Sequence, residues 1–180
     1  IPGEIGTTLT DREAWEQLYL PKLKMCQERV NVEYFKNMPK SETRDIPLGI
    51  HLGSLMGNMR NMLGVENLSY LYADDEELYA EIVDTLCGLC YECAKLQLSA
   101  GAEYDYAHYW EDICFKNGPL VTPGVFRELV GPWYRKISDL VNSYGIDIIS
   151  LDCDGCIDAL IPIWLENGVN TMFPIEVGTW

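Results

Sequence analysis

The sequence has little positive charge and no long apolar segment. It contains 13 lysines and arginines against 28 aspartates and glutamates, for a formal net charge of −15. Such a chain repels the phosphates of nucleic acids and the headgroups of anionic membranes, so neither is an expected partner. No apolar run approaches the ~18 residues of a membrane span, and residues 1–20 lack the pattern of a signal peptide.

The features of a disulfide scaffold are absent as well. Seven cysteines, an odd number, are spread over 180 residues, whereas extracellular disulfide scaffolds are usually shorter and denser in cysteine. We therefore expect free thiols in a cytoplasmic protein. With 48% hydrophobic and 23% charged residues and no low-complexity tract, the chain is expected to form a single domain over 1–180.

Apolar segments of strand length alternate with segments of helix length, which is typical of an α/β protein with parallel strands. Residues 1–46 are predicted as a helical lead-in, in which Thr10 and Glu13 form a capping box and Pro21 kinks a helix over 11–30. Residues 47–180 are predicted as about four strand–helix repeats. The strands are expected at 47–54, 103–107, 146–151 and 170–175, and the helices at 54–64, 75–99, 122–144 and 156–168.

The helix at 75–99 is expected to open with a capping box of Asp74 and Glu77, and the helix at 54–64 to stop at Gly64. Four parallel strands with long helices fit either a small doubly wound sheet or part of a larger barrel. The abrupt ends of the pattern, with no helix after the last strand, favour the barrel.

Ligands of parallel α/β folds lie beyond the carboxyl ends of the strands. In this sequence each predicted strand is followed by at least one acid or histidine. The candidates are His51, Ser54 and Arg60 after the first strand, Asp105, His108, Trp110, Glu111 and Asp112 after the second, Asp152 and Asp154 after the third, and Glu176 after the last. We expect these side chains to converge on one site.

Several candidates have a purely structural alternative. His51 fits equally well as a hydrogen-bonded histidine inside its strand, and Arg60 as a residue on an exposed helix face. Asp154 is suited to cap the helix predicted from residue 156. Asp152 directly follows its strand and has no comparable structural role.

Two cysteine motifs raise the question of a metal or redox site. CGLCYEC (87–93) and CDGC (153–156) together supply enough thiols for zinc, but the 59 residues between them far exceed the roughly 15–20 of a zinc ribbon. The first motif lies within a predicted helix, where free cysteine packs as a small apolar residue. The second lies at a strand-to-helix junction, as a thioredoxin-type C-x-x-C does, so a metal or redox protein stays an alternative.

WEDICFKNGPLVTPGVFRELVGPWYRKI (110–137) and GIDIISLDCDGCIDALIPIWLENGVNTMFPIEVGTW (145–180) resemble the uroporphyrinogen decarboxylase superfamily. The likeness is greatest to its bacterial branch, which is grouped with the corrinoid-dependent methyltransferases. It is good over 100–180 and diffuse but collinear over 47–100. The resemblance implies a partial (β/α)8 TIM barrel of the uroporphyrinogen decarboxylase type, whose exposed sheet edges lead us to expect a homo-oligomer.

The resemblance implies a methyltransferase that moves a methyl group between a small methylated substrate and the corrinoid of a separate protein. Zinc-containing members carry His-x-Cys after the strand that matches 146–151, and Asp152 and Asp154 stand at those positions here. Two acids do not reproduce that zinc site, so zinc is a doubtful cofactor. One of the two aspartates is the expected general acid, which protonates the departing oxygen or nitrogen, with Glu111 and Asp112 as further catalytic acids.

The remaining candidates are assigned to substrate binding: His51, Arg60, His108, Trp110, Lys116 and Glu176. One alternative function is decarboxylation of a porphyrinogen-like carboxylated substrate, which requires cations to bind the carboxylates. Arg60 stands where the decarboxylases have a catalytic tyrosine, and it faces many acids with only Lys116 as a second cation. Another alternative is a truncated barrel without catalysis that serves as a binding or assembly module.

Overall fold

The computed structural model describes residues 8–179. Its main sheet has four parallel strands, β1 (Gly49–Gly53), β2 (Tyr106–Trp110), β5 (Ile149–Asp152) and β6 (Thr171–Phe173), and they neighbour one another in chain order. The prediction of four parallel strands is therefore confirmed. A doubly wound sheet would reverse the strand order at a switch point, and this sheet does not.

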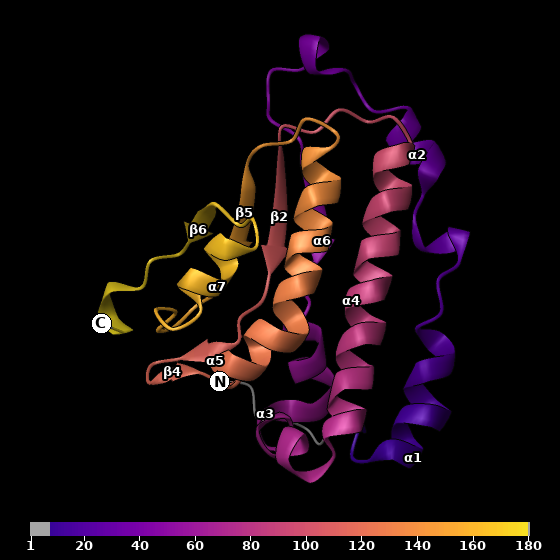
Figure 1. The fold of residues 1–180 in the computed structure, drawn as a ribbon. Coiled ribbons are helices and arrows are strands. Elements are labelled where there is room, and N and C mark those ends of the chain that lie inside the picture. The colour runs from indigo at the N-terminus through magenta and orange to yellow at the C-terminus, as the bar shows by residue number, and fades with distance from the viewer. Residues whose placement is uncertain (1–7, 180) are drawn as a thin grey trace.

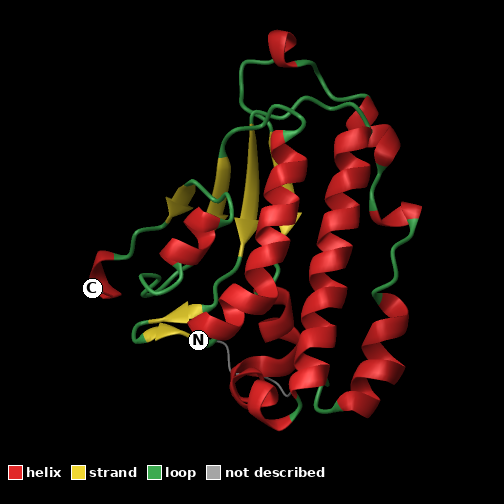
Figure 2. Ribbon diagram, viewed as in Figure 1, coloured by secondary structure: helices red, strands yellow, loops and turns green. Residues whose placement is uncertain are grey.

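Long helices cover one face of the sheet. In Figure 1, α4 (Glu76–Ser99) and α6 (Gly131–Asn142) lie side by side in front of the strands. Figure 2 shows the same layering, with the red helices over the yellow strands. The other helices after β1 are α3 (Gly57–Asp74), which leads into α4, then α5 (Pro123–Val125), which continues into a π-helical turn at Phe126–Val130, and α7 (Ile161–Glu166). None of the described helices combines the length and apolarity that a membrane crossing requires.

Side chains alternate between the two faces of each strand, as the pleat dictates. On the helix side, Ile50, Leu52, Ala107, Tyr109 and Leu151 are almost fully buried and join the core. On the opposite side, His51 is exposed and His108 half-buried, whereas Ser150 of β5 is buried. In α4, Cys87 is fully buried within that core, which confirms the predicted packing role for this cysteine of CGLCYEC.

The lead-in is more broken than predicted. It consists of α1 (Arg12–Ala14), a π-helical turn (Trp15–Tyr19), 3-10 turns at Leu20–Lys22, Gln27–Arg29 and Ser41–Thr43, and α2 (Val32–Lys36). The cap of the first helix is Asp11 and not Thr10, because Asp11 Oδ1 accepts a hydrogen bond of 2.8 Å from the Ala14 amide. The helix ends near residue 22 and not 30, because Pro21 supplies no amide to extend it.

Other boundaries also differ from the predictions. Asp75, not Asp74, caps α4 by accepting from the Leu78 amide at 2.8 Å. Gly64 does break its helix, with a φ of 74°, but helical structure resumes through residue 74, which the sequence did not indicate. Between the strand predicted at 103–107 and the helix predicted at 122–144 lies a hairpin of β3 (Cys114–Phe115) and β4 (Gly118–Pro119), which was not predicted.

The strand predicted at 103–107 runs from 106 to 110, so the residues expected after it lie partly inside it. The helix predicted at 156–168 is reduced to α7 because its first part forms turns.

Candidate functional site

The carboxyl ends of the strands meet at one edge of the sheet. Trp110 pairs in register with Asp152, and Asp152 with Phe173. This edge lies at the lower end of the strands in Figure 1, near the β3–β4 hairpin, the start of α3 and α5. The structure therefore brings the ends of β2, β5 and β6 together, as expected for a site at this edge.

Glu111, predicted as a catalytic acid, is fully buried beneath this edge. Its carboxylate accepts hydrogen bonds from the amides of residues 55, 56 and 57 at 2.8, 2.8 and 2.9 Å, from Ser54 Oγ at 3.1 Å and from the Tyr134 hydroxyl. Burial raises the pKa of Glu111, and the bonds from Tyr134 and the amides oppose that rise. The carboxylate anchors the first turn of α3, so these contacts favour an anchoring role over the predicted catalytic one.

Asp112 and Arg60 form an ion pair above this anchor. Arg60 Nη1 donates to the Asp112 carbonyl oxygen at 2.6 Å and to its Oδ2 at 2.9 Å, and the guanidinium lies 5.6 Å from the centre of the Trp110 ring. Asp112 has a φ of 49°, and this turn of the backbone directs its carbonyl oxygen and its Oδ2 toward Arg60. Only 17% of the Arg60 side chain is exposed. The alternative of an exposed arginine on the helix surface is therefore wrong.

The remaining acids lie around the CDGC loop. Asp154 is exposed, and its pKa is raised first by partial burial of the carboxyl group and then by the charges of Asp112, Glu176 and Asp152. Glu176 Oε2 accepts a hydrogen bond of 2.7 Å from the Gly155 amide, so this acid holds the loop as well as facing the site. Because α7 begins only at residue 161, with Leu160 in its capping position, Asp154 does not cap it.

Both histidines lie inside strands, on the sheet face opposite the helices. Their ring centres are 5.7 Å apart, and His108 stacks on Phe173 with ring centres 5.3 Å apart and planes at 13°. His51 Nδ1 accepts from the Gly53 amide at 2.9 Å, and His108 Nδ1 lies 3.0 Å from Ser150 Oγ. Burial lowers the pKa of both histidines, and for His108 the neighbouring His51 adds to this while Asp152 opposes it.

Three contributors to this region were not predicted: Phe173, Ser150 and Tyr134. Because side chains alternate between the two faces of a strand, Phe173 and Ser150 lie on the same face as His108. This placement could have been predicted from the sequence. Tyr134 reaches Glu111 from α6, and no local pattern indicates that contact. Lys116, predicted to bind substrate, is exposed at the turn of the β3–β4 hairpin.

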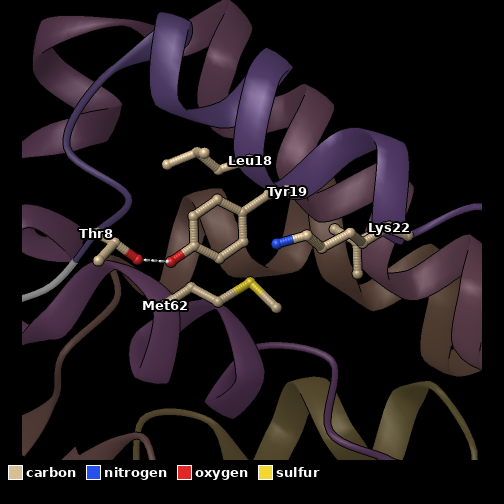
Figure 3. A pocket seen from close by; sticks show the side chains of 6 residues that line it. Thr8, Leu18, Tyr19, Lys22 and Met62 are labelled. Atoms are coloured by element: carbon tan, nitrogen blue, oxygen red, sulfur yellow. Dashed lines mark hydrogen bonds between the residues drawn. The ribbon is translucent and has the colours of Figure 1, made fainter.

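Within residues 8–179, no three His, Cys, Asp or Glu side chains gather closely enough to hold a metal ion. The pocket in Figure 3 lies between the lead-in and α3. It has a volume of about 370 Å³, and the hydroxyls of Thr8 and Tyr19 are hydrogen-bonded across it. Its lining also includes Leu18, Lys22 and Met62. No candidate of the strand-end site lines this pocket.

No protein-family model and no curated protein sequence matches the chain. Among solved structures, a methyltransferase from Methanosarcina mazei is similar over 91% of this chain, with a TM-score of 0.59 and 15% sequence identity. The match covers 44% of that protein, so the chain spans less than half the length of its structural neighbour. At this identity the likeness shows the fold, an α/β arrangement of parallel strands and long helices shared with a methyltransferase.

Proposed function

We propose that the chain forms one arc of a (β/α)8 barrel of the uroporphyrinogen decarboxylase type and belongs to a methyltransferase. The enzyme moves a methyl group between a small methylated substrate and the corrinoid of a separate protein. The observation that carries the proposal is the set of carboxylates at the ends of parallel strands, in a fold shared with a methyltransferase. The corrinoid protein and the substrate class come from the resemblance in the sequence.

The strand arrangement supports the barrel. Neighbouring strands follow chain order and helices pack on one face, as in an arc of a barrel. Within the described residues, β1 pairs only with β2 and β6 only with β5, so both edges of the sheet are open for further strands. A complete barrel has eight strands, of which this arc supplies four.

The acids supply the proton that methyl transfer requires. When a methyl group leaves an oxygen or nitrogen, the remaining anion is a poor leaving group unless an acid protonates it. Asp154 is the best candidate for that acid, because its raised pKa keeps a proton on the carboxyl group to higher pH than an ordinary aspartate does. Asp152 and Glu176 add the negative charge that sustains the raised pKa.

Decarboxylation of a carboxylated substrate is less well supported. A substrate carboxylate needs an uncompensated cation, and the Arg60 guanidinium is already paired with Asp112. The surrounding acids would repel a second carboxylate.

The test is methyl transfer to cob(I)alamin by the intact protein, followed by the absorbance change of the corrinoid with a panel of methoxy and methylamine compounds. With an accepted substrate, the Asp152→Asn, Asp154→Asn double variant is expected to lose at least about 100-fold in kcat, the lower range of general acid catalysis. Asp158→Asn is the matched control, since Asp158 is an exposed aspartate of the same loop region. Full activity of the double variant would refute the role of these acids.

A further inference from the structure

Two buried thiols lie directly below the proposed acids and have no part in the function proposed above. Cys153 sits between Asp152 and Asp154 and is fully buried, and Cys114 is 3% exposed at the start of β3. Both are free; Cys153 Sγ donates to the Asp154 carbonyl oxygen at 3.6 Å, and the Cys153 thiol is the neighbour that most raises the pKa of Cys114. The Ile113 amide also donates to Cys153 Sγ at 3.4 Å. The two cysteines are 39 positions apart in the sequence, so the contact exists only in the folded chain.

The backbone holds the two segments side by side. The Glu111 amide donates to the Asp152 carbonyl oxygen at 2.9 Å, and the Cys156 amide donates to the Phe115 carbonyl oxygen at 2.9 Å. The two buried cysteines lie between these bonds. The Ile113 amide bond to Cys153 Sγ holds that sulfur beside the residue that precedes Cys114, and a disulfide forms where Cα atoms lie roughly 4.4–6.8 Å apart.

We propose that Cys114 and Cys153 are a redox modification site whose reversible disulfide shifts the aspartates on either side of Cys153. With hydrogen peroxide as oxidant, the Cys114 thiolate attacks one peroxide oxygen, which gives a sulfenic acid and one water. The Cys153 thiolate then attacks the sulfenic sulfur and expels the second water. Two thiols and one peroxide thus give one disulfide and two waters, and a dithiol reductant reverses the change.

The β3–β4 hairpin controls access to the pair. Each of its strands has two residues, and Phe115 is 49% exposed; an isolated two-stranded hairpin is at best marginally stable and can open locally. In the closed hairpin, the hydrogen bond with Cys153 and then burial raise the pKa of Cys114, which keeps the thiol protonated and unreactive. Opening of the hairpin exposes the thiol to the oxidant.

This pairing differs from the one that the C-x-x-C motif predicts. In a thioredoxin-type motif Cys153 would pair with Cys156. Here the Cys156 amide is bound to Phe115, and the Gly155 amide between the two cysteines is bound to Glu176, so the loop holds its shape without that bridge. Identification of the cross-linked residues therefore separates the two hypotheses.

The experiment treats the reduced, native protein with a small excess of hydrogen peroxide, then denatures and alkylates it for mass spectrometry. We expect five of the seven cysteines to be alkylated, with one cross-linked peptide that joins residues 114 and 153. Dithiothreitol should restore alkylation at all seven. A bridge between Cys153 and Cys156, or oxidation without a bridge, would overturn the proposal.

Variants and a spectroscopic readout complete the test. Cys114→Ser and Cys153→Ser should each abolish the cross-link, whereas Cys26→Ser, at an exposed cysteine of the lead-in, should keep it. The carboxyl ¹³C resonances of Asp152 and Asp154 should shift on oxidation of the wild type and return on reduction. The same treatment should leave them unchanged in Cys114→Ser. Unchanged resonances in a cross-linked wild type would refute the effect on the aspartates, and no part of this test requires methyltransferase activity.

Discussion

Replacement of Glu111 tests whether this carboxylate anchors α3. Glu111→Ala leaves the buried amides of residues 55–57 without their acceptor, as well as the hydroxyls of Ser54 and Tyr134. Each buried donor without a partner costs about 1–3 kcal/mol. The hydroxyls can turn to other acceptors but the three amides cannot, so we expect a loss of at least about 3 kcal/mol.

That loss is large beside the roughly 5–15 kcal/mol by which a typical domain is stable. Glu111→Gln keeps one carbonyl oxygen in place and should lose less, about 2 kcal/mol. Tyr134→Phe removes one hydrogen bond to the carboxylate and should cost about 1.5 kcal/mol. The order of the three losses follows from the number of hydrogen bonds to the carboxylate that each change removes.

Urea unfolding followed by circular dichroism measures these differences, with the slope of the transition as a check on two-state behaviour. Glu92→Gln, at an exposed glutamate of α4, is the matched control and should stay within about 0.5 kcal/mol of the wild type. If Glu111→Ala is as stable as this control, or more stable than Glu111→Gln, the anchoring argument fails.

Two further predictions concern the backbone and the acids of the strand-end site. Gly57→Ala should destabilise the protein by about 3 kcal/mol, because a Cβ there would lie 2.2 Å from a backbone carbonyl oxygen of the facing segment. Gly124→Ala, where a Cβ meets nothing within 4 Å, should be neutral or stabilising by about 0.5 kcal/mol, and equal losses in urea unfolding would contradict the packing argument. The raised pKa of Asp154 means that the folded state holds this proton more tightly than the unfolded chain, so this group's contribution to stability falls as pH rises above 3.8. Asp152→Asn removes one repelling charge and should lower the Asp154 pKa in a ¹³C NMR titration, whereas a rise would refute the assigned cause.

The fold was more accessible from the sequence than the site. Strand-length and helix-length apolar segments predicted the four parallel strands, because burial of a sheet face and a helix face imposes different periods on the chain. Boundaries were less accurate, as at Asp75, because adjacent aspartates are nearly equivalent as caps and the surrounding packing selects between them.

At the site, the positions of the acids directly after the strands predicted which acids would lie close together. They did not predict the role of each acid. Glu111 and Asp112 are adjacent in the sequence, yet one is a buried anchor and the other pairs with Arg60 near the surface. The difference arises because the side chains of adjacent residues in an extended chain point to opposite sides. Only the packing of the helices determines which side is buried from water.

The amino-acid sequence by itself determined the class of the fold and the strand ends at which acids accumulate. Both follow from local regularities, the periodicity of apolar residues and the residues that stop helices and strands. Only the tertiary structure decided that the strands follow chain order, that Glu111 holds the start of α3, and that Cys153 lies against Cys114 rather than pairing within its own motif. Each of these depends on contacts between segments far apart in the chain, whose energies no local pattern records.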